Sequence, residues 1–229
     1  MVRMAGDGVS MTPGYRVVTA IGGPIMWRWS RMEVTGLECL PPIGPVLVVA
    51  DHDSYWDPIA IAVAAKKVRQ IRALAKASLW SNKIVAAFMT EMGHIPVERG
   101  VSNAEALATA EEELRKGACI GIFPEGTRSL GCELRARAGV GRLAEAVPEA
   151  TIVCARTNGS VDVVRLPKRP RIRVEFYRPA GGRPQPGETA GEFSERLLAE
   201  LREGAPREIP GRRRTAAKYR ERAATKAST

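Results

Sequence analysis

Residues 46–58 read VLVVADHDSYWDP, and this stretch decides the fold class. Its first five residues form an unbroken apolar run, which is typical of a strand buried on both faces of a parallel sheet. Pro58 then opens a second apolar run that is long enough for a helix, and Asp57 is expected at its N-cap. A buried strand that passes through a short polar loop into a helix is the repeating unit of α/β folds.

The same alternation continues along the chain. Further strands are predicted at residues 68–75, 95–97, 119–123, 151–155 and 171–176, and further helices at 82–92, 102–116, 139–146 and 192–202. A chain of 229 residues suits one α/β domain and is too short for two comfortable ones. We therefore predict a single domain over residues 31–205, with a mixed, mostly parallel sheet flanked by helices on both faces.

Residues 1–30 are predicted to form an N-terminal helical arm that faces a membrane. Its apolar part, YRVVTAIGGPIMWRW at residues 15–29, is shorter than the ~20 residues a membrane span needs, and Gly-Gly-Pro interrupts it. Arginine and tryptophan side chains give it an interfacial character. Packing on the domain's own core is the alternative, and both can hold. No secretory signal pattern is evident.

Residues 206–229 form a basic tail, expected to be disordered or helical only on a surface. The whole chain carries a net charge of +10, and much of that excess lies in this segment, which has almost no large apolar residues. Basic segments suit anionic lipid headgroups and nucleic acid equally well, so the charge alone chooses neither.

The four cysteines show no metal-binding spacing, and no metal or cofactor is expected. Cys119 and Cys154 lie within apolar runs, where a free cysteine acts as a small hydrophobic residue. This usage fits a reducing, cytosolic compartment.

His52 and Asp57 form the first polar cluster that could carry chemistry. A neutral imidazole can accept a proton, and a carboxylate bonded to its other nitrogen fixes the tautomer. The alternative is a polar turn in which Asp57 only caps a helix, which is worth about 1 kcal/mol.

Two more clusters follow predicted strands. In FPEGTRS, residues 123–129, Arg128 offers a planar fork for phosphate or carboxylate; a surface ion pair with Glu125 is the alternative. In GHIPVER, residues 93–99, His94 has no orienting carboxylate nearby and is interpreted as structural.

No glycine-rich phosphate loop and no nucleophile elbow is present in the sequence. A base without an enzyme nucleophile favours direct transfer to an acceptor hydroxyl over a covalent acyl-enzyme.

The three clusters, in this order, resemble the motifs of the glycerolipid acyltransferases typified by 1-acylglycerol-3-phosphate acyltransferases. The family's first motif, H-x-x-x-x-D, matches His52 and Asp57. Its second, G-x-I-P-V-x-R, matches residues 93–99, and its third, FPEGTRS, matches residues 123–129 without a gap. The resemblance runs over residues 27–179.

The resemblance implies a role for each matching residue. His52 would be the general base and Asp57 would hold its ring. The acceptor and its phosphate would be bound by residues of the second and third motifs and by two basic residues at positions where the family often has lysine: Lys76, Arg99, Glu125, Gly126, Thr127, Arg128 and Arg137. Glu125 cannot attract phosphate itself and is expected to orient an arginine or the acceptor hydroxyl.

It also implies the partners. The expected reaction moves a fatty acyl group from acyl-CoA or acyl carrier protein to a lysophospholipid such as 1-acylglycerol-3-phosphate. We expect a cytoplasmic protein, peripheral on the inner face of the membrane at an anionic surface, and no nucleic-acid partner.

Two departures from the family pattern keep the acceptor open. Asp51 stands where the family usually has asparagine, and residues 152–155 lack the proline of its fourth motif. The same chemistry on a glycolipid or specialised metabolite is therefore an alternative, and a basic membrane-binding module without catalysis is a further one.

Overall fold

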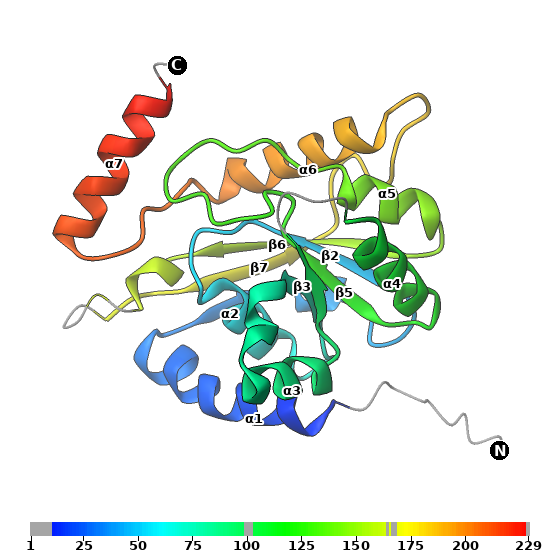
Figure 1. The fold of residues 1–229 in the computed structure, drawn as a ribbon, viewed down its shortest axis with the longest axis horizontal. Coiled ribbons are helices and arrows are strands. Elements are labelled where there is room, and N and C mark those ends of the chain that lie inside the picture. The colour runs from blue at the N-terminus through cyan, green and yellow to red at the C-terminus, as the bar shows by residue number, and fades with distance from the viewer. Residues whose placement is uncertain (1–10, 99–102, 164, 166–168, 228–229) are drawn as a thin grey trace.

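The computed structural model describes residues 11–98, 103–163, 165 and 169–227 of the chain (Figure 1). Its centre is a seven-stranded sheet in the order β1-β7-β6-β2-β5-β3-β4. The strands, in chain order, are β1 (Glu33–Thr35), β2 (Val46–Ala50), β3 (Arg72–Lys76), β4 (Ile95–Val97), β5 (Cys119–Ile122), β6 (Thr151–Asn158) and β7 (Arg173–Tyr177). Neighbouring strands are parallel except for the antiparallel pair β6–β7. This confirms the predicted mixed, mostly parallel sheet.

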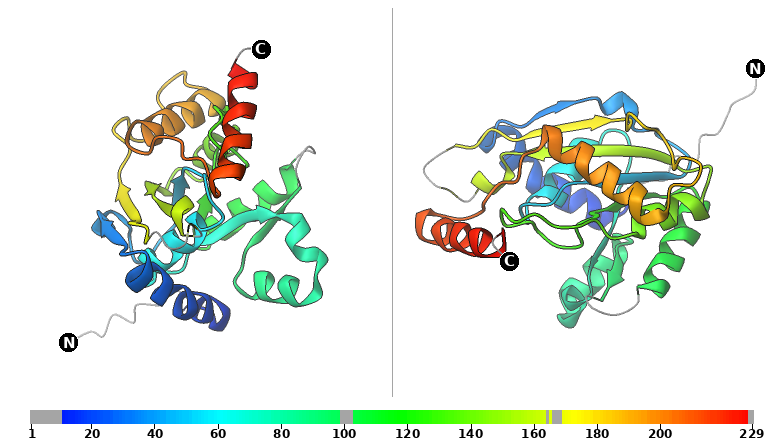
Figure 2. Two further views of the ribbon diagram at one scale, coloured as in Figure 1. Left: turned by 90° about the vertical axis from the view of Figure 1, so that its left-hand side faces the viewer. Right: turned by 90° about the horizontal axis from the view of Figure 1, so that it is seen from above.

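Helices cover both faces of the sheet, as predicted (Figures 1 and 2). The helices are α1 (Pro13–Pro24), α2 (Asp57–Ala65), α3 (Lys83–Glu91), α4 (Ala104–Arg115), α5 (Gly139–Ala146), α6 (Ala190–Gly204) and α7 (Arg213–Ala227). Strand β2 shows why: Val48 packs in a core with Ile61 of α2, whereas Leu47 packs in a second core with Leu114 of α4 and Leu197 of α6. Successive strand residues point to opposite faces, so an all-apolar strand needs helices on both.

The ends of three neighbouring strands bring the polar clusters together. β2 lies between β5 and β6 and is parallel to both. Their carboxyl ends, at Ala50, Ile122 and Asn158, therefore lie at one edge of the sheet. Ligand sites in open α/β sheets gather at this edge.

Helix α1 packs on the domain and also presents apolar side chains to solvent. Tyr15 is buried and its hydroxyl donates to the carbonyl of Ala62 in α2, at 3.1 Å. Val17 and Ile21 of α1 are exposed, as is Trp27 in the helical turn Ile25–Trp29 that follows it. In the described part of the chain, no helix is long and apolar enough to cross a bilayer.

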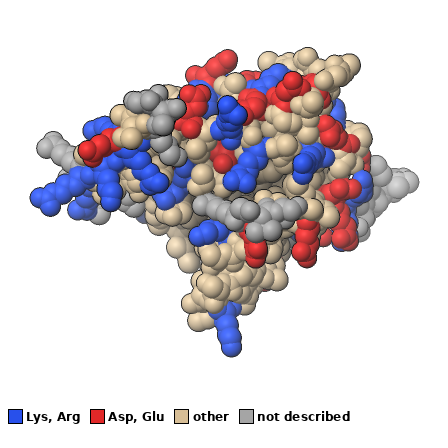
Figure 3. All heavy atoms as spheres, turned by 45° about the horizontal axis from the view of Figure 1, so that its top comes forward, with Lys and Arg blue, Asp and Glu red and all other residues tan. Residues whose placement is uncertain are grey.

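The apolar side chains of the helix predicted at residues 82–92 are largely uncovered. Helix α3 forms there, capped by the side chain of Asn82, but none of its own residues is buried, and Ile84 is 82% exposed. Only Met92, just beyond the helix, is buried. The lower projection in Figure 3, where α3 lies, is accordingly almost free of charged side chains.

The basic tail, expected to be disordered or helical only on a surface, contains a helix in the structure. Residues 213–227 form helix α7, with Lys and Arg side chains gathered over it at the left of Figure 3. The preceding residues are held by hydrogen bonds to the domain, among them Glu208, which reaches the strand ends. The residues just after position 205 are thus in contact with the domain.

Cys119 and Cys154 are buried in the cores, as free cysteines. Residue 102, where a helix was predicted to begin, lies outside the described residues; α4 begins after Asn103, whose side chain makes no capping bond.

Candidate active site

His52 and Asp57 are in direct contact at the end of β2. His52 Nδ1 lies 2.9 Å from Asp57 Oδ2. The turn of residues 51–56 folds back, so that the side chains at its two ends meet. Helix α2 begins at Asp57 itself, and Trp56 occupies the N-cap position. The prediction that Asp57 caps the helix is therefore wrong: its carboxylate points to the turn and the imidazole.

The Asp57 carboxylate is fixed from all sides. Besides the imidazole, Oδ2 accepts the backbone N–H groups of Asp53 and Ser54, both at 2.7 Å, and Oδ1 accepts the hydroxyl of Ser160. Asp57 is fully buried. An ionised acceptor requires that Nδ1 carry the proton, which leaves Nε2 of His52 free to accept one.

The loop after β5 holds His52 in place. Phe123 stacks on the imidazole with ring centroids 4.4 Å apart. The backbone N–H of His52 donates to Glu125 Oε2 at 2.9 Å, and the N–H of Ser129 donates to the carbonyl of His52 at 2.8 Å. The first and third polar clusters are thus one structure, although 73 residues separate His52 from Glu125.

Glu125 orients an arginine, but one that the sequence analysis missed. Its other oxygen, Oε1, accepts from Arg202 of α6 at 2.6 Å. Burial raises the pKa of Glu125, and the Arg202 guanidinium opposes that rise. The alternative surface ion pair between Glu125 and Arg128 is not formed.

Arg202 joins three buried carboxylates behind the imidazole. Its guanidinium binds Asp53 through both terminal nitrogens, at 2.9 and 3.0 Å, in addition to Glu125, and its side chain is 5% exposed. Burial disfavours the cation, but the bonds to Asp53 and the charges of Asp53 and Glu125 outweigh it, and the pKa of Arg202 is raised. Asp51 Oδ2 lies 3.9 Å away.

Asp51 is buried beside the same group, in surroundings that favour its neutral form. Its Oδ1 accepts the backbone N–H of Thr157 on β6 at 2.9 Å, whereas Oδ2 has no hydrogen-bond partner among the described residues. Burial, and next the neighbouring charge of Asp57, raise the pKa of Asp51 well above its ordinary value. The surroundings thus oppose ionisation of the acid that the sequence places beside His52.

Glu208 ties the C-terminal segment to the same group. Both of its carboxylate oxygens lie 3.0 Å from the backbone N–H of Gly159, and its own N–H donates to Asp53 Oδ2 at 2.9 Å. Burial raises the pKa of Glu208 to about 7.

The rest of the third cluster forms a tight turn beside Arg137. Gly126 has φ +66°, and a Cβ there would approach Arg137 Nε to 2.6 Å. The backbone N–H of Arg137 donates to the carbonyl of Pro124 at 2.8 Å. Thr127 follows in the same turn, and the guanidinium of Arg128 lies over the ring of Tyr55, 3.6 Å from its centroid.

Of the other predicted phosphate-binding residues, Lys76 lies away from this group. Lys76 is exposed at the end of β3, in register with Val97 and two strands away from β2. Arg99 lies outside the described residues. His94 is structural, as interpreted: its Nδ1 accepts the backbone N–H of Ala73 at 2.9 Å, and burial lowers its pKa to about 4.

No group of three or more His, Cys, Asp or Glu side chains that could hold a metal ion occurs in the ranges the structure describes. The chemistry available at the strand ends is that of a histidine base held by a carboxylate, with arginines nearby.

Comparison with known proteins identifies the family. The sequence model of the Acyltransferase family matches residues 31–158, which is more than half of the chain. The chain belongs to the Acyltransferase family. The matched range includes every predicted site residue of this acyltransferase-family chain, from His52 to Arg137.

Curated relatives and a solved structure agree with the assignment. The chain is 25% identical over 152 residues to the 1-acyl-sn-glycerol-3-phosphate acyltransferase of Bacillus subtilis, covering 66% of this chain and 65% of that protein. It is 30% identical over 144 residues to the chloroplastic 1-acyl-sn-glycerol-3-phosphate acyltransferase LPAT1 of Arabidopsis thaliana, covering 62% and 37%. The chain thus spans less than two thirds of the length of these relatives.

The fold also matches that of a solved acyltransferase. The 1-acyl-sn-glycerophosphate acyltransferase PlsC from Thermotoga maritima superposes with a TM-score of 0.61 at 22% identity, over 83% of this chain and 77% of that one. At this identity the likeness shows the fold.

In this acyltransferase-family chain, the site residues that the motifs did not predict were missed for one reason. Arg202 and Glu208 lie beyond the matched range 31–158, on and after α6. The one signal for them was the crowding of acids near the strand ends, at Asp51, Asp53 and Glu125, which demands a buried cation from elsewhere in the chain.

Proposed function

We propose that this protein transfers a fatty acyl group from acyl-CoA or acyl carrier protein to the hydroxyl of a lysophospholipid such as 1-acylglycerol-3-phosphate. The observation that carries the proposal is the His52–Asp57 pair: a histidine with Nδ1 held at 2.9 Å by a buried carboxylate and Nε2 free as a base. Family membership and the names of the relatives support the reaction class.

In this mechanism His52 is the general base. Nε2 takes the proton of the acceptor hydroxyl while that oxygen attacks the thioester carbonyl carbon. The tetrahedral intermediate collapses with cleavage of the carbon–sulfur bond, and the imidazolium returns the proton to the leaving thiolate. Asp57 stabilises the imidazolium through Nδ1–H, and such base catalysis is typically worth about 10²–10⁴-fold in rate.

The acceptor phosphate would be bound by the turn after β5. A dianion needs more than one cation or N–H donor. Arg128 and the turn of Gly126 and Thr127 lie beside the His52 loop, and Arg137 packs under the same turn. Arg99 and Lys76 are carried as further candidates by their positions in the family motifs.

We propose also that the protein acts as a peripheral protein on the inner face of the cytoplasmic membrane. Helix α1 exposes the apolar side chains of Val17 and Ile21. It is joined to α3 by a hydrogen bond in which the Gly14 N–H donates to Glu91 Oε2 at 2.9 Å. Helix α3 exposes Ile84 and Val85. Together they offer an apolar face for the bilayer interface, and the basic α7 suits anionic headgroups.

The direct test is thiol release from a matrix of donors and acceptors with purified protein. Acyl-CoA and acyl carrier protein are each combined with lysophosphatidic acid, a lysoglycolipid or no acceptor, and products are identified by mass spectrometry. Release that requires lysophosphatidic acid supports the proposal. Turnover of the lysoglycolipid alone would show that the enzyme catalyses the same reaction on the alternative class of acceptor. No thiol release with any donor and acceptor pair would contradict the proposed catalysis.

A further inference from the structure

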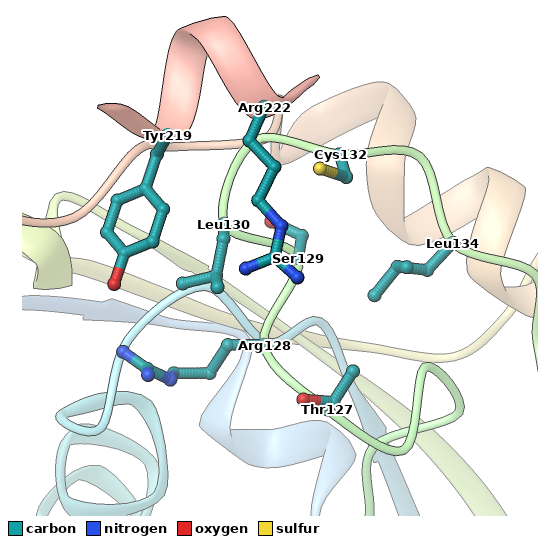
Figure 4. A pocket seen from close by; sticks show the side chains of 8 residues that line it. All are labelled: Thr127, Arg128, Ser129, Leu130, Cys132, Leu134, Tyr219 and Arg222. Atoms are coloured by element: carbon teal, nitrogen blue, oxygen red, sulfur yellow. The ribbon is translucent and has the colours of Figure 1, made fainter. Parts of the chain in front are cut away.

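A pocket lies between the loop of residues 127–134 and the C-terminal helix α7 (Figure 4). Thr127 and Arg128 line it from the loop, and Tyr219 and Arg222 line it from α7. Its volume is about 170 Å³, several times the roughly 30 Å³ that one water occupies in the liquid, so a phosphate-sized group fits.

The pocket is cationic and lacks a protein counter-charge. Two of its lining residues are arginines and none is acidic. Figure 4 shows the Arg222 guanidinium directed down from α7 toward the loop, on the same side as the hydroxyl of Tyr219. Neither Arg128 nor Arg222 pairs with a carboxylate within the described ranges, and Glu133, the acid of this loop, pairs with Arg207 at 3.5 Å.

The position of α7 is set by contacts on the segment before it. Glu208 is bonded to Gly159, and the guanidinium of Arg165 donates through Nε to the carbonyl of Gly211 at 2.8 Å. On the helix itself Ala216 is buried. Tyr219 and Arg222 follow it at intervals of three residues, so all three lie on the face turned to the domain.

Arg128 and Arg222 line one cavity that has no acidic residue in its lining, so an anion bound there would be stabilised by both positive charges. A phosphate monoester is a dianion whose oxygens match the planar fork of arginine. The geometry points to α7 as a part of the binding site: we propose that Arg222, with Tyr219, completes with Arg128 a pocket for the phosphate monoester of a substrate. This rests on the proposed function, in which two substrates carry such a group, the acceptor headgroup and the 3′-phosphate of CoA.

The test compares Arg222→Ala with Arg220→Ala. Both variants remove one positive charge from α7, but Arg220 is exposed and does not line the pocket. Thiol release is measured with short-chain substrates in detergent, so that attraction to vesicles plays no part. The acceptor is lysophosphatidic acid or monoacylglycerol, and the donor is acyl-CoA or acyl-dephospho-CoA.

The expected result is a KM raised about 10- to 100-fold in Arg222→Ala for the substrate that carries the phosphate, as for loss of one charged hydrogen bond, with kcat changed only a few-fold. The difference in KM between Arg222→Ala and the wild type disappears when that substrate lacks its phosphate. The substrate for which it disappears, acceptor or donor, is the one whose phosphate the pocket binds. Arg220→Ala keeps the wild-type KM. Equal KM values for the two variants would overturn the proposal.

A second readout is independent of turnover. Millimolar glycerol 3-phosphate or adenosine 3′-phosphate should raise the Tm of the wild type and of Arg220→Ala but not of Arg222→Ala, because a ligand stabilises the state that binds it. A pocket that binds these compounds in a protein that releases no thiol would refute the proposed function and leave this site standing. An equal Tm rise in all three proteins would refute the site.

Discussion

At the scale of single residues, Asp57 is the position on which the site depends most. Its two carboxylate oxygens take four hydrogen bonds, from the His52 ring, the N–H groups of Asp53 and Ser54, and the hydroxyl of Ser160. All four donors require an acceptor, so no residue other than an ionised carboxylate satisfies them.

Asp57→Asn should therefore lower kcat by at least about 100-fold while KM changes little. An amide presents only one oxygen, so either the imidazole adopts the wrong tautomer or a backbone N–H loses its partner. Steady-state thiol release measures the effect. Ser160→Ala is the control, because it removes one bond but leaves the carboxylate, and its loss should be much smaller; equal losses would contradict the orienting role.

Asp51→Asn should keep the activity and stabilise the protein. The amide oxygen can still accept the N–H of Thr157, and the variant abolishes a buried acid whose pKa is raised above the ordinary 3.8. An acid with a raised folded-state pKa loses stability as the pH rises, because the native state binds more protons than the unfolded one. The Tm advantage of the variant should therefore open above pH 3.8 and grow as the pH rises toward the raised pKa. A constant or shrinking difference would show that Asp51 is ionised in the native state.

At the scale of elements, helix α6 contributes to the site through Arg202. The helix packs its apolar face, including Phe193 and Leu197, in the core and ends beside the carboxyl ends of the strands. One basic residue near its end thereby neutralises acids from the loops after β2 and β5.

Arg202→Met should reduce the free energy of unfolding by about 3–5 kcal/mol, because Asp53 and Glu125 would remain buried without a counter-charge. Denaturant titration gives the value. Combining it with Asp53→Asn should recover part of the loss in a double-mutant cycle. Glu203→Ala, at an exposed neighbour on the same helix, should change the free energy of unfolding by less than about 0.5 kcal/mol. A change this small for Arg202→Met would contradict the claim that Arg202 neutralises the buried acids.

Most elements could be predicted from the sequence, and the exceptions have physical reasons. The apolar run at residues 46–50, for example, specifies its strand locally. Strand β1 has three residues and exists through its pairing with β7, which no local pattern encodes. The exposed apolar face of α3 cannot be distinguished by its period from a face that packs in the core.

At the scale of the whole molecule, the C-terminal part of the chain supplies residues that bind the acids around the site. Residues 31–158 carry the family match, but the chain returns through α6 to place Arg202 and Glu208 at the strand ends. The motifs predicted which loops meet, because strand-end geometry is shared by the fold. They could not predict Arg202 or Glu208, because a buried cation can come from any element that reaches the acids.

Glu208→Gln should make stability less sensitive to pH. The folded-state pKa of Glu208 is about 7 against an ordinary value of 4.5, so its carboxyl destabilises the native protein progressively as the pH rises from 4.5 to 7. The Tm difference between variant and wild type should be near its minimum below pH 4.5, increase up to about pH 7 and then level off. Glu203→Gln, at an exposed site, is the control and should show no such step; a flat difference for Glu208→Gln would place its pKa at the ordinary value.

The central claim, that His52 is the base of an acyl transfer, is tested most directly by the kcat of thiol release in His52→Ala, measured with the donor and acceptor that the wild type uses. His94→Ala serves as the comparison, since it removes the other histidine, which is bonded to Ala73 in the sheet. The account predicts a fall in kcat of about 10²–10⁴-fold for His52→Ala in a protein that still folds, with His94→Ala affecting Tm more than turnover. A His52→Ala protein with kcat within a few-fold of the wild type would contradict it.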